Sequence, residues 1–153
     1  IGNSNLELDI YGEGSEKENL TELAKKYNSK VNFLGKVSND HLIKKLTNYK
    51  YFVSSTLYEG NPKALLEAMS AGCIVIAPNV SGVNEIITNE YNGYLYELEN
   101  NNLTNFINEV DEKDNTLIIK NTKEFLSKKH EIKMIAEKEE NVYSYLFNIS
   151  KIS

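Results

Sequence analysis

Hydrophobic and polar positions follow two periods along the first two thirds of the chain. Short apolar or alternating runs predict strands at residues 6–11, 31–34, 51–54, 73–77 and 93–96. Between them, apolar residues recur every three or four positions and predict helices at 15–28 and 62–71, another after Ser38 or Asn39, and a shorter one at 81–87. This alternation favours an α/β fold, a Rossmann-like parallel sheet with helices on both faces.

The chain of 153 residues has the length of one domain, residues 1–153. Residues 1–97 are expected to form the parallel α/β core. Residues 98–153 are charged but keep apolar residues at helical spacing, so we expect a tail of C-terminal helices. The aromatic stretch from Tyr143 to Phe147 favours packing, either in the core or against another domain, over a membrane anchor.

The amino-acid composition argues against nucleic acid and metal ions as ligands. The formal net charge is −5, and all 17 basic residues are lysines, so nucleic acid is not an expected partner and no guanidinium can clamp a phosphate. The single cysteine, Cys73, opens the apolar run at 73–77 and is expected in the core. The two histidines, His41 and His130, form no metal-binding spacing, and we expect no metal site.

Ligands of parallel sheets bind outside the carboxyl ends of the strands. That rule selects four loops: Gly12-Glu13-Gly14, Gly35-Lys36-Val37, residues 55–61 and residues 78–82. The pair Gly12 and Gly14 lacks the third glycine of a dinucleotide fingerprint, because Lys17 stands there. A plain turn is therefore favoured over a dehydrogenase site.

The helix predicted at 62–71 carries the most informative chemistry. Asn61 is its expected N-cap and Pro62 its first residue, and Lys63, Ala64 and Glu67 share the face opposite its leucines. Glu67 lies roughly 7 Å beyond the helix start, and Glu59 stands just before it. Two carboxylates that flank a helix N-terminus, itself an anion site, suit a nucleotide sugar. A plain surface ion pair between Lys63 and Glu67 remains the alternative.

Six segments in order resemble the nucleotide-sugar-binding C-terminal domain of the GT-B retaining glycosyltransferases of family 4, glycosyltransferase group 1. They are residues 8–14, Val31 to Gly35, Ser54-Ser55 with Tyr58-Glu59-Gly60, residues 66–69 with Ala71-Gly72, Gly82 with Glu85-Ile86, and Asn92-Gly93. The resemblance covers residues 6–96. Beyond them it rests on helical character alone.

The resemblance implies roles for the candidate residues. Glu59 would be the catalytic residue, facing the donor sugar, and Glu67 would accept hydrogen bonds from both ribose hydroxyls. Backbone N–H groups of Gly60, Asn61 and Lys63 would hold sugar hydroxyls and diphosphate, and the loop at 35–37 would lie beside the base. The implied donor site comprises Gly12, Gly14, Gly35, Lys36, Val37, Glu59, Gly60, Asn61, Pro62, Lys63, Ala64 and Glu67.

Such enzymes retain the anomeric configuration and need no metal, which agrees with the absence of an Asp-x-Asp pair. The expected donor is a UDP-sugar or GDP-sugar, with no other cofactor. The reaction implied is transfer of a hexose-type sugar to a glycan or lipid-linked acceptor in bacterial surface polysaccharide synthesis. It would take place in the cytoplasm, including the inner face of the membrane, which the chain would reach through a domain outside this sequence.

The resemblance also implies what lies outside the chain. An N-terminal acceptor-binding domain is the expected partner, and the family's diphosphate-gripping Arg and Lys belong to a first strand–helix unit upstream. Asn61 stands where the family has an aromatic or other large residue, which leaves the sugar open. Two other functions stay open: a regulatory nucleotide-binding module without turnover, and a nucleotide-sugar epimerase on the same two-domain plan.

Overall fold

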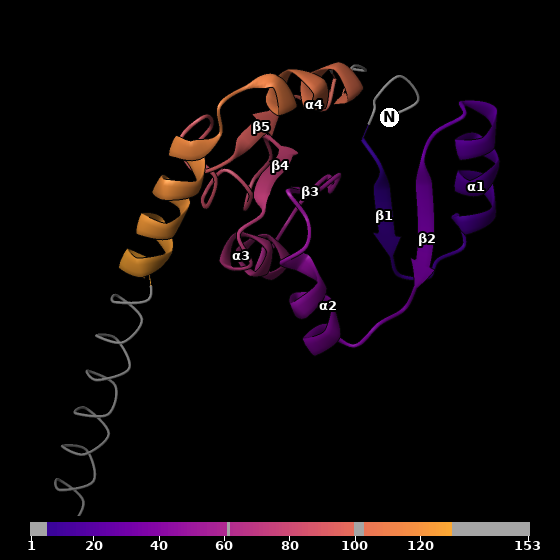
Figure 1. Ribbon diagram of the computed structural model, residues 1–153, viewed down its shortest axis with the longest axis horizontal. Coiled ribbons are helices and arrows are strands. Elements are labelled where there is room, and N and C mark those ends of the chain that lie inside the picture. Colours follow the sequence, from indigo (N-terminus) through magenta and orange to yellow (C-terminus); the bar gives the residue numbers. More distant parts are fainter. Residues whose placement is uncertain (1–5, 61, 100–102, 130–153) are drawn as a thin grey trace, which may run out of the picture.

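The computed structural model describes residues 6–60, 62–99 and 103–129 (Figure 1). The elements confirm the predicted alternation of strands and helices. They are β1 (Leu8–Tyr11), α1 (Lys17–Lys26), β2 (Val31–Gly35), α2 (Asn39–Leu46), β3 (Tyr51–Val53), α3 (Lys63–Ser70), β4 (Ile74–Pro78), β5 (Tyr94–Tyr96) and α4 (Leu103–Glu112). A further helix covers residues 116–129.

Among the described residues, all the strand pairings are parallel, as the sequence predicts, but the strands form two sheets rather than one. The first sheet pairs β1 with β2, and the second has the order β3-β4-β5. In Figure 1, β1 lies between β2 and the second sheet. The local hydrophobic pattern predicts each strand but does not encode which strands become neighbours.

The core lies on both faces of β4, whose five residues are all buried. Val75 and Ala77 pack in a cluster with Leu65 and Met69 of α3. Ile74 and Ile76 belong to a second cluster that includes Ile107, Val110 and Ile118. The second sheet is therefore covered by α3 on one face and by α4 on the other, and the last helix contributes Ile118 to the α4 side and Phe125 to the α3 side. Helices on both faces confirm the predicted arrangement of layers.

Three local predictions differ from the structure. Residues 81–86 form consecutive turns, because N–H groups there donate to carbonyls both three and four residues back. Helix α3 starts at Lys63 with Pro62 as its cap, one residue later than expected. Asn61, the expected cap, lies outside the described residues, as do His130 and the aromatic stretch from Tyr143 to Phe147.

The predicted place of Cys73 in the core is confirmed. Cys73 is buried and its thiol donates to the carbonyl of Leu46, and burial raises the pKa of that thiol. His41 is exposed on α2. Within the described ranges, no helix is both long and apolar enough to cross a membrane.

Candidate functional site

Glu67 stands on α3, on the face opposite the buried residues Leu65 and Met69. Its side chain is 18% exposed, whereas that of Lys63 is 71% exposed. Lys63 Nζ lies 3.4 Å from Glu67 Oε1, so the surface ion pair weighed from the sequence does form. At that distance and exposure such a pair contributes little to stability, and it does not account for the burial of the carboxylate.

A second group reaches the same carboxylate from another part of the chain. Asn39, the first residue of α2, donates from Nδ2 to Glu67 Oε1 over 3.2 Å. The sequence suggested Asn39 only as a helix cap. Its contact with Glu67 spans 28 residues, so no local pattern could have revealed it. It brings the start of α2 beside the middle of α3.

The N-terminus of α3 is the natural anion site of this region. Pro62 precedes the helix, and no side chain caps it. The N–H groups of Lys63 and Ala64 lie in the first turn, where an α-helix offers no carbonyl to them. Both residues are exposed. Two N–H donors and the positive end of a helix dipole thus point to one place, and the ammonium of Lys63 lies one turn further along, beside Glu67.

Glu59 is held by the segment that follows β4. Its backbone N–H donates to the carbonyl of Ser81 over 3.4 Å. Gly82 is buried, with φ +84°, and a Cβ built on it would lie 1.7 Å from the carbonyl oxygen of Glu59. Glu59 itself is half-buried, and Gly60 beside it is exposed. Two of the loops selected from the sequence are therefore packed closely against each other, backbone to backbone.

The two remaining loops meet at the ends of β1 and β2. The N–H of Gly12 donates to the carbonyl of Gly35 over 2.9 Å, and φ is +131° at Gly12 and +71° at Gly35. Gly14 is exposed and keeps a negative φ. Beyond Gly35, Lys36 is exposed and Val37 half-buried, and the chain then enters α2 two residues later, at Asn39.

The structure thus brings the ends of β1 and β2 together through Gly12 and Gly35, and the start of α2 beside the middle of α3 through Asn39 and Glu67. The loop at 35–37 leads directly into the residue that contacts Glu67, and Gly12 joins it through a hydrogen bond. The described part of the chain contains no cluster of three or more His, Cys, Asp or Glu side chains that could hold a metal ion.

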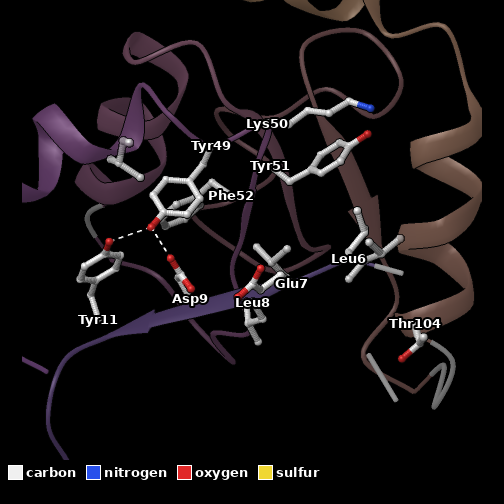
Figure 2. Close-up of a pocket in the computed structure, with 13 residues that line it drawn as sticks. Leu6, Glu7, Leu8, Asp9, Tyr11, Tyr49, Lys50, Tyr51, Phe52 and Thr104 are labelled. Carbon is white, nitrogen blue, oxygen red and sulfur yellow. Dashed lines mark hydrogen bonds between the residues drawn. The ribbon is translucent and has the colours of Figure 1, made fainter. Parts of the chain in front are cut away.

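A polar cluster that the sequence analysis did not single out joins β1 to the segment before β3 (Figure 2). Tyr49 donates its hydroxyl to Asp9 over 2.5 Å, and the hydroxyl of Tyr11 lies 2.7 Å from that of Tyr49. The bond from Tyr49, with one from Asn32, lowers the pKa of Asp9. Burial and the bond to Asp9 raise the pKa of Tyr49. The cluster borders a cavity of about 260 Å³ that none of the predicted donor residues lines.

Comparison with known proteins assigns the family. Residues 2–125 match the family described as glycosyl transferases group 1. An Escherichia coli relative, UDP-Gal:alpha-D-GlcNAc-diphosphoundecaprenol alpha-1,3-galactosyltransferase, is 46% identical over 57 residues, which are 37% of this chain and 14% of the relative. An uncharacterized glycosyltransferase of Haemophilus influenzae is 30% identical over 139 residues, or 85% of this chain and 35% of the relative.

A solved structure agrees with the sequence comparison. The crystal structure of TarM is similar with a TM-score of 0.72 and 26% identity, over 91% of this chain and 29% of the TarM chain. The chain therefore spans well under half the length of each of these three proteins. Its Rossmann-like fold agrees with the C-terminal domain of a GT-B glycosyltransferase, and the chain belongs to the glycosyl transferases group 1 family.

Proposed function

We propose that this chain is the donor-binding domain of a glycosyltransferase and that it binds a nucleoside-diphosphate sugar around the N-terminus of α3. The observation that carries the proposal is the setting of Glu67. Its carboxylate is largely buried, yet its described partners, Asn39 and Lys63, lie at the long distances of 3.2 and 3.4 Å. A carboxylate offers about four acceptor positions, enough for two ribose hydroxyls besides these partners.

The diphosphate, the sugar and the base of the donor are placed around the start of α3. The diphosphate lies at the free N–H groups of Lys63 and Ala64, with Asn61 and Pro62 beside it, and the Lys63 ammonium supplies a positive charge. The donor sugar lies toward Glu59 and Gly60, where Glu59 stabilises charge that develops during transfer. The base lies against residues 35–37, near Gly12 and Gly14. The donor is a UDP-sugar or GDP-sugar, and no further cofactor takes part.

The reaction proposed is retaining transfer of a hexose-type sugar without a metal ion. Positive charge at the diphosphate comes from a helix N-terminus and a lysine, which act on the leaving group as a metal would in a metal-dependent enzyme. Transfer also needs an acceptor-binding domain, which we place outside these 153 residues, in a longer polypeptide that includes this chain and that we call the longer protein. The Escherichia coli relative is named for UDP-Gal as donor and a diphosphoundecaprenol-linked sugar as acceptor, which supports a UDP-hexose and a lipid-linked acceptor for this chain. A lipid-linked acceptor also supports our proposal that the reaction belongs to surface polysaccharide synthesis and takes place at the inner face of the membrane.

Calorimetric titration of the longer protein with UDP and GDP tests the proposal. Glu67→Ala should weaken binding of the preferred nucleotide by about 1.5–3 kcal/mol, the range for hydrogen bonds to a charged group. Lys63→Ala keeps Glu67 but removes both the ion pair and the charge at the diphosphate. Titration of both variants with the bare nucleoside, which carries no diphosphate, therefore isolates the ribose contact: Glu67→Ala should weaken it and Lys63→Ala should leave it nearly unchanged. Unchanged affinity in a folded Glu67→Ala variant would contradict the proposed role.

A further inference from the structure

Asn92 is a buried polar residue that the proposed donor site does not use. It stands between the turns at 81–86 and β5, and it is 2% exposed. In the sequence it stood out only as half of the Asn92-Gly93 pair. Burial of an amide side chain costs free energy unless its donor and acceptor groups are hydrogen-bonded. The partners of Asn92 therefore show what it does in the core.

The Asn92 side chain binds the end of the turns through two backbone groups. Its Oδ1 accepts the N–H of Thr88 over 2.7 Å, and its Nδ2 donates to the carbonyl of Ile86 over 3.0 Å. Ile86 is buried, so its carbonyl would lose a partner in the core if the amide were removed. One side chain thus fixes both the last residue of the turns and the residue two positions beyond it.

The last helix and β4 hold Asn92 itself in place. The hydroxyl of Thr122 lies 3.0 Å from the carbonyl oxygen of Asn92, and Asn121 donates from Nδ2 to the carbonyl of Tyr91 over 3.0 Å. Both helix residues are buried. A Cβ built on Gly93 would lie 3.0 Å from a carbonyl oxygen of β4, so the backbone next to Asn92 is packed against the sheet. Asn92 is therefore anchored to the core.

The other end of the turns contacts Glu59. Ser81 accepts the N–H of Glu59, and Gly82 lies so close to the Glu59 carbonyl that no Cβ fits between them. Between the two ends, the carbonyls of Val80 and Val83 each accept N–H groups from the residues three and four positions further along. The segment is therefore hydrogen-bonded within itself, and a shift at its Asn92 end moves the end that contacts Glu59.

Apolar packing places these turns in the core but does not orient them. Val83, Ile86 and Ile87 belong to the cluster that includes Leu65 and Met69 of α3. Apolar contact is non-directional, whereas a hydrogen bond needs a defined distance and angle. The two bonds from Asn92 therefore set the orientation of the turns within that cluster.

We propose that Asn92 is a positioning residue for residues 55–60, the Glu59 loop: its amide fixes one end of the turns at 81–86, and their other end fixes Glu59. The expected effect on sugar transfer rests on the proposed function of Glu59. Misplacement of an active-site group by about 1 Å can cost about 100-fold in rate. Loss of Asn92 should therefore lower turnover, while the nucleotide site at Glu67 on α3 keeps its affinity.

Asn92→Ala and Asn115→Ala in the longer protein form a matched pair. Asn115 is also buried, donates to the carbonyl of Val110 over 2.8 Å and accepts from the hydroxyl of Tyr94 over 2.7 Å. These bonds join α4 to β5 and lie outside the turns. Both variants should unfold at lower urea concentration. Only Asn92→Ala should lower kcat at saturating donor, by about 10-fold or more, with a Kd for the preferred nucleotide within about twofold of the original.

Hydrogen–deuterium exchange gives a second readout that does not depend on activity. The Glu59 loop should exchange about 10-fold faster in Asn92→Ala, since loss of one buried hydrogen bond shifts a local opening equilibrium on that scale. Its exchange rate should stay unchanged in Asn115→Ala. Thr122→Val removes only the hydroxyl that contacts Asn92, and it serves where Asn92→Ala does not fold. Thr122→Ser keeps the hydroxyl and should restore both exchange and kcat.

Unchanged exchange of the Glu59 loop in Asn92→Ala and Thr122→Val would overturn the inference, whatever the activity. Equal loss of kcat in Asn92→Ala and Asn115→Ala would also overturn it, because the effect would then be a general loss of stability. Faster exchange of the loop with unchanged kcat would support the positioning role of Asn92 and contradict the proposed role of Glu59. The two proposals therefore fail by different results.

Discussion

Gly82 and Glu59 are packed so closely that no side chain fits between them. A Cβ on Gly82 would lie 1.7 Å from the carbonyl oxygen of Glu59 and 2.8 Å from its carbonyl carbon. Both atoms belong to the backbone, so neither can move aside by a change of rotamer. The position of the Glu59 loop is therefore fixed by the absence of a side chain at residue 82.

Gly82→Ala should displace the Glu59 loop and impair sugar transfer by the longer protein. Gly72→Ala is the matched control, since Gly72 has a similar φ of +93° but open space around its Cβ. Each variant places alanine at a positive φ, which costs about 1–3 kcal/mol. Only Gly82→Ala adds the clash, so it should lower the free energy of unfolding further and reduce kcat. Denaturant unfolding and initial-rate assays measure the two effects. Equal activity of the two variants would refute the positioning role.

Glu59→Gln should separate the sugar end of the donor site from the nucleotide end. We expect almost unchanged affinity for the bare nucleoside diphosphate, because Glu59 is proposed to face the sugar. Turnover of the longer protein should fall by about 100-fold or more, the scale for losing one group that stabilises charge in the transition state. Calorimetric affinity for the nucleoside diphosphate and turnover, measured on the same preparation, test the two expectations. If Glu59→Gln weakens nucleotide binding as much as Glu67→Ala does, the two ends are assigned wrongly.

Acid should destabilise the fold in part through Asp9. Hydrogen bonds from Tyr49 and Asn32 lower its pKa in the folded state relative to the unfolded chain. The stabilisation is therefore complete above the ordinary carboxyl pKa and is lost as the pH falls through the lowered folded value. Tyr49→Phe removes the largest cause, so its free energy of unfolding should fall less steeply between about pH 5 and pH 2. Urea unfolding across that range measures the slope.

A parallel slope in Tyr49→Phe and the unchanged protein would contradict the role of Asp9. Some pH dependence should persist in the variant. Hydrogen bonds from Lys50 and Tyr51 also lower the pKa of Asp111, and Tyr49→Phe does not touch that cluster.

The sequence predicted the elements of this fold well because each has a local cause. The unbroken apolar run at 73–77 predicted a strand covered on both faces, and β4 is such a strand. The separation into two sheets had no local signal, since pairing joins residues far apart in the chain. The runs that became β1 and β3 predicted strands correctly but could not show that, among the described residues, each would pair along one edge only.

The residues of the candidate site also fall into those with a local sequence signal and those without one. Glu59 and Glu67 could be selected because their spacing around a helix start is a local pattern. Asn39 could not, because its contact with Glu67 depends on how α2 and α3 pack. Gly82 was noted only as one residue of a family motif. Its steric role appears once two loops from different strands come together.

The 153-residue chain alone should bind nucleotide weakly and should not transfer sugar. The positive charge at the proposed diphosphate site is limited to Lys63 and helix N–H groups, in a chain of net charge −5 without arginine. We therefore expect a Kd for UDP or GDP of about 0.1–1 mM. Transfer requires a closed cleft that excludes water, and a second domain must form its other wall. Calorimetric titration of the chain with UDP and GDP measures the Kd. Incubation with UDP-hexoses and glycan acceptors, beside the longer protein as positive control, measures transfer. Sustained transfer by the 153-residue chain would show that the acceptor site lies within it and would overturn this division of roles.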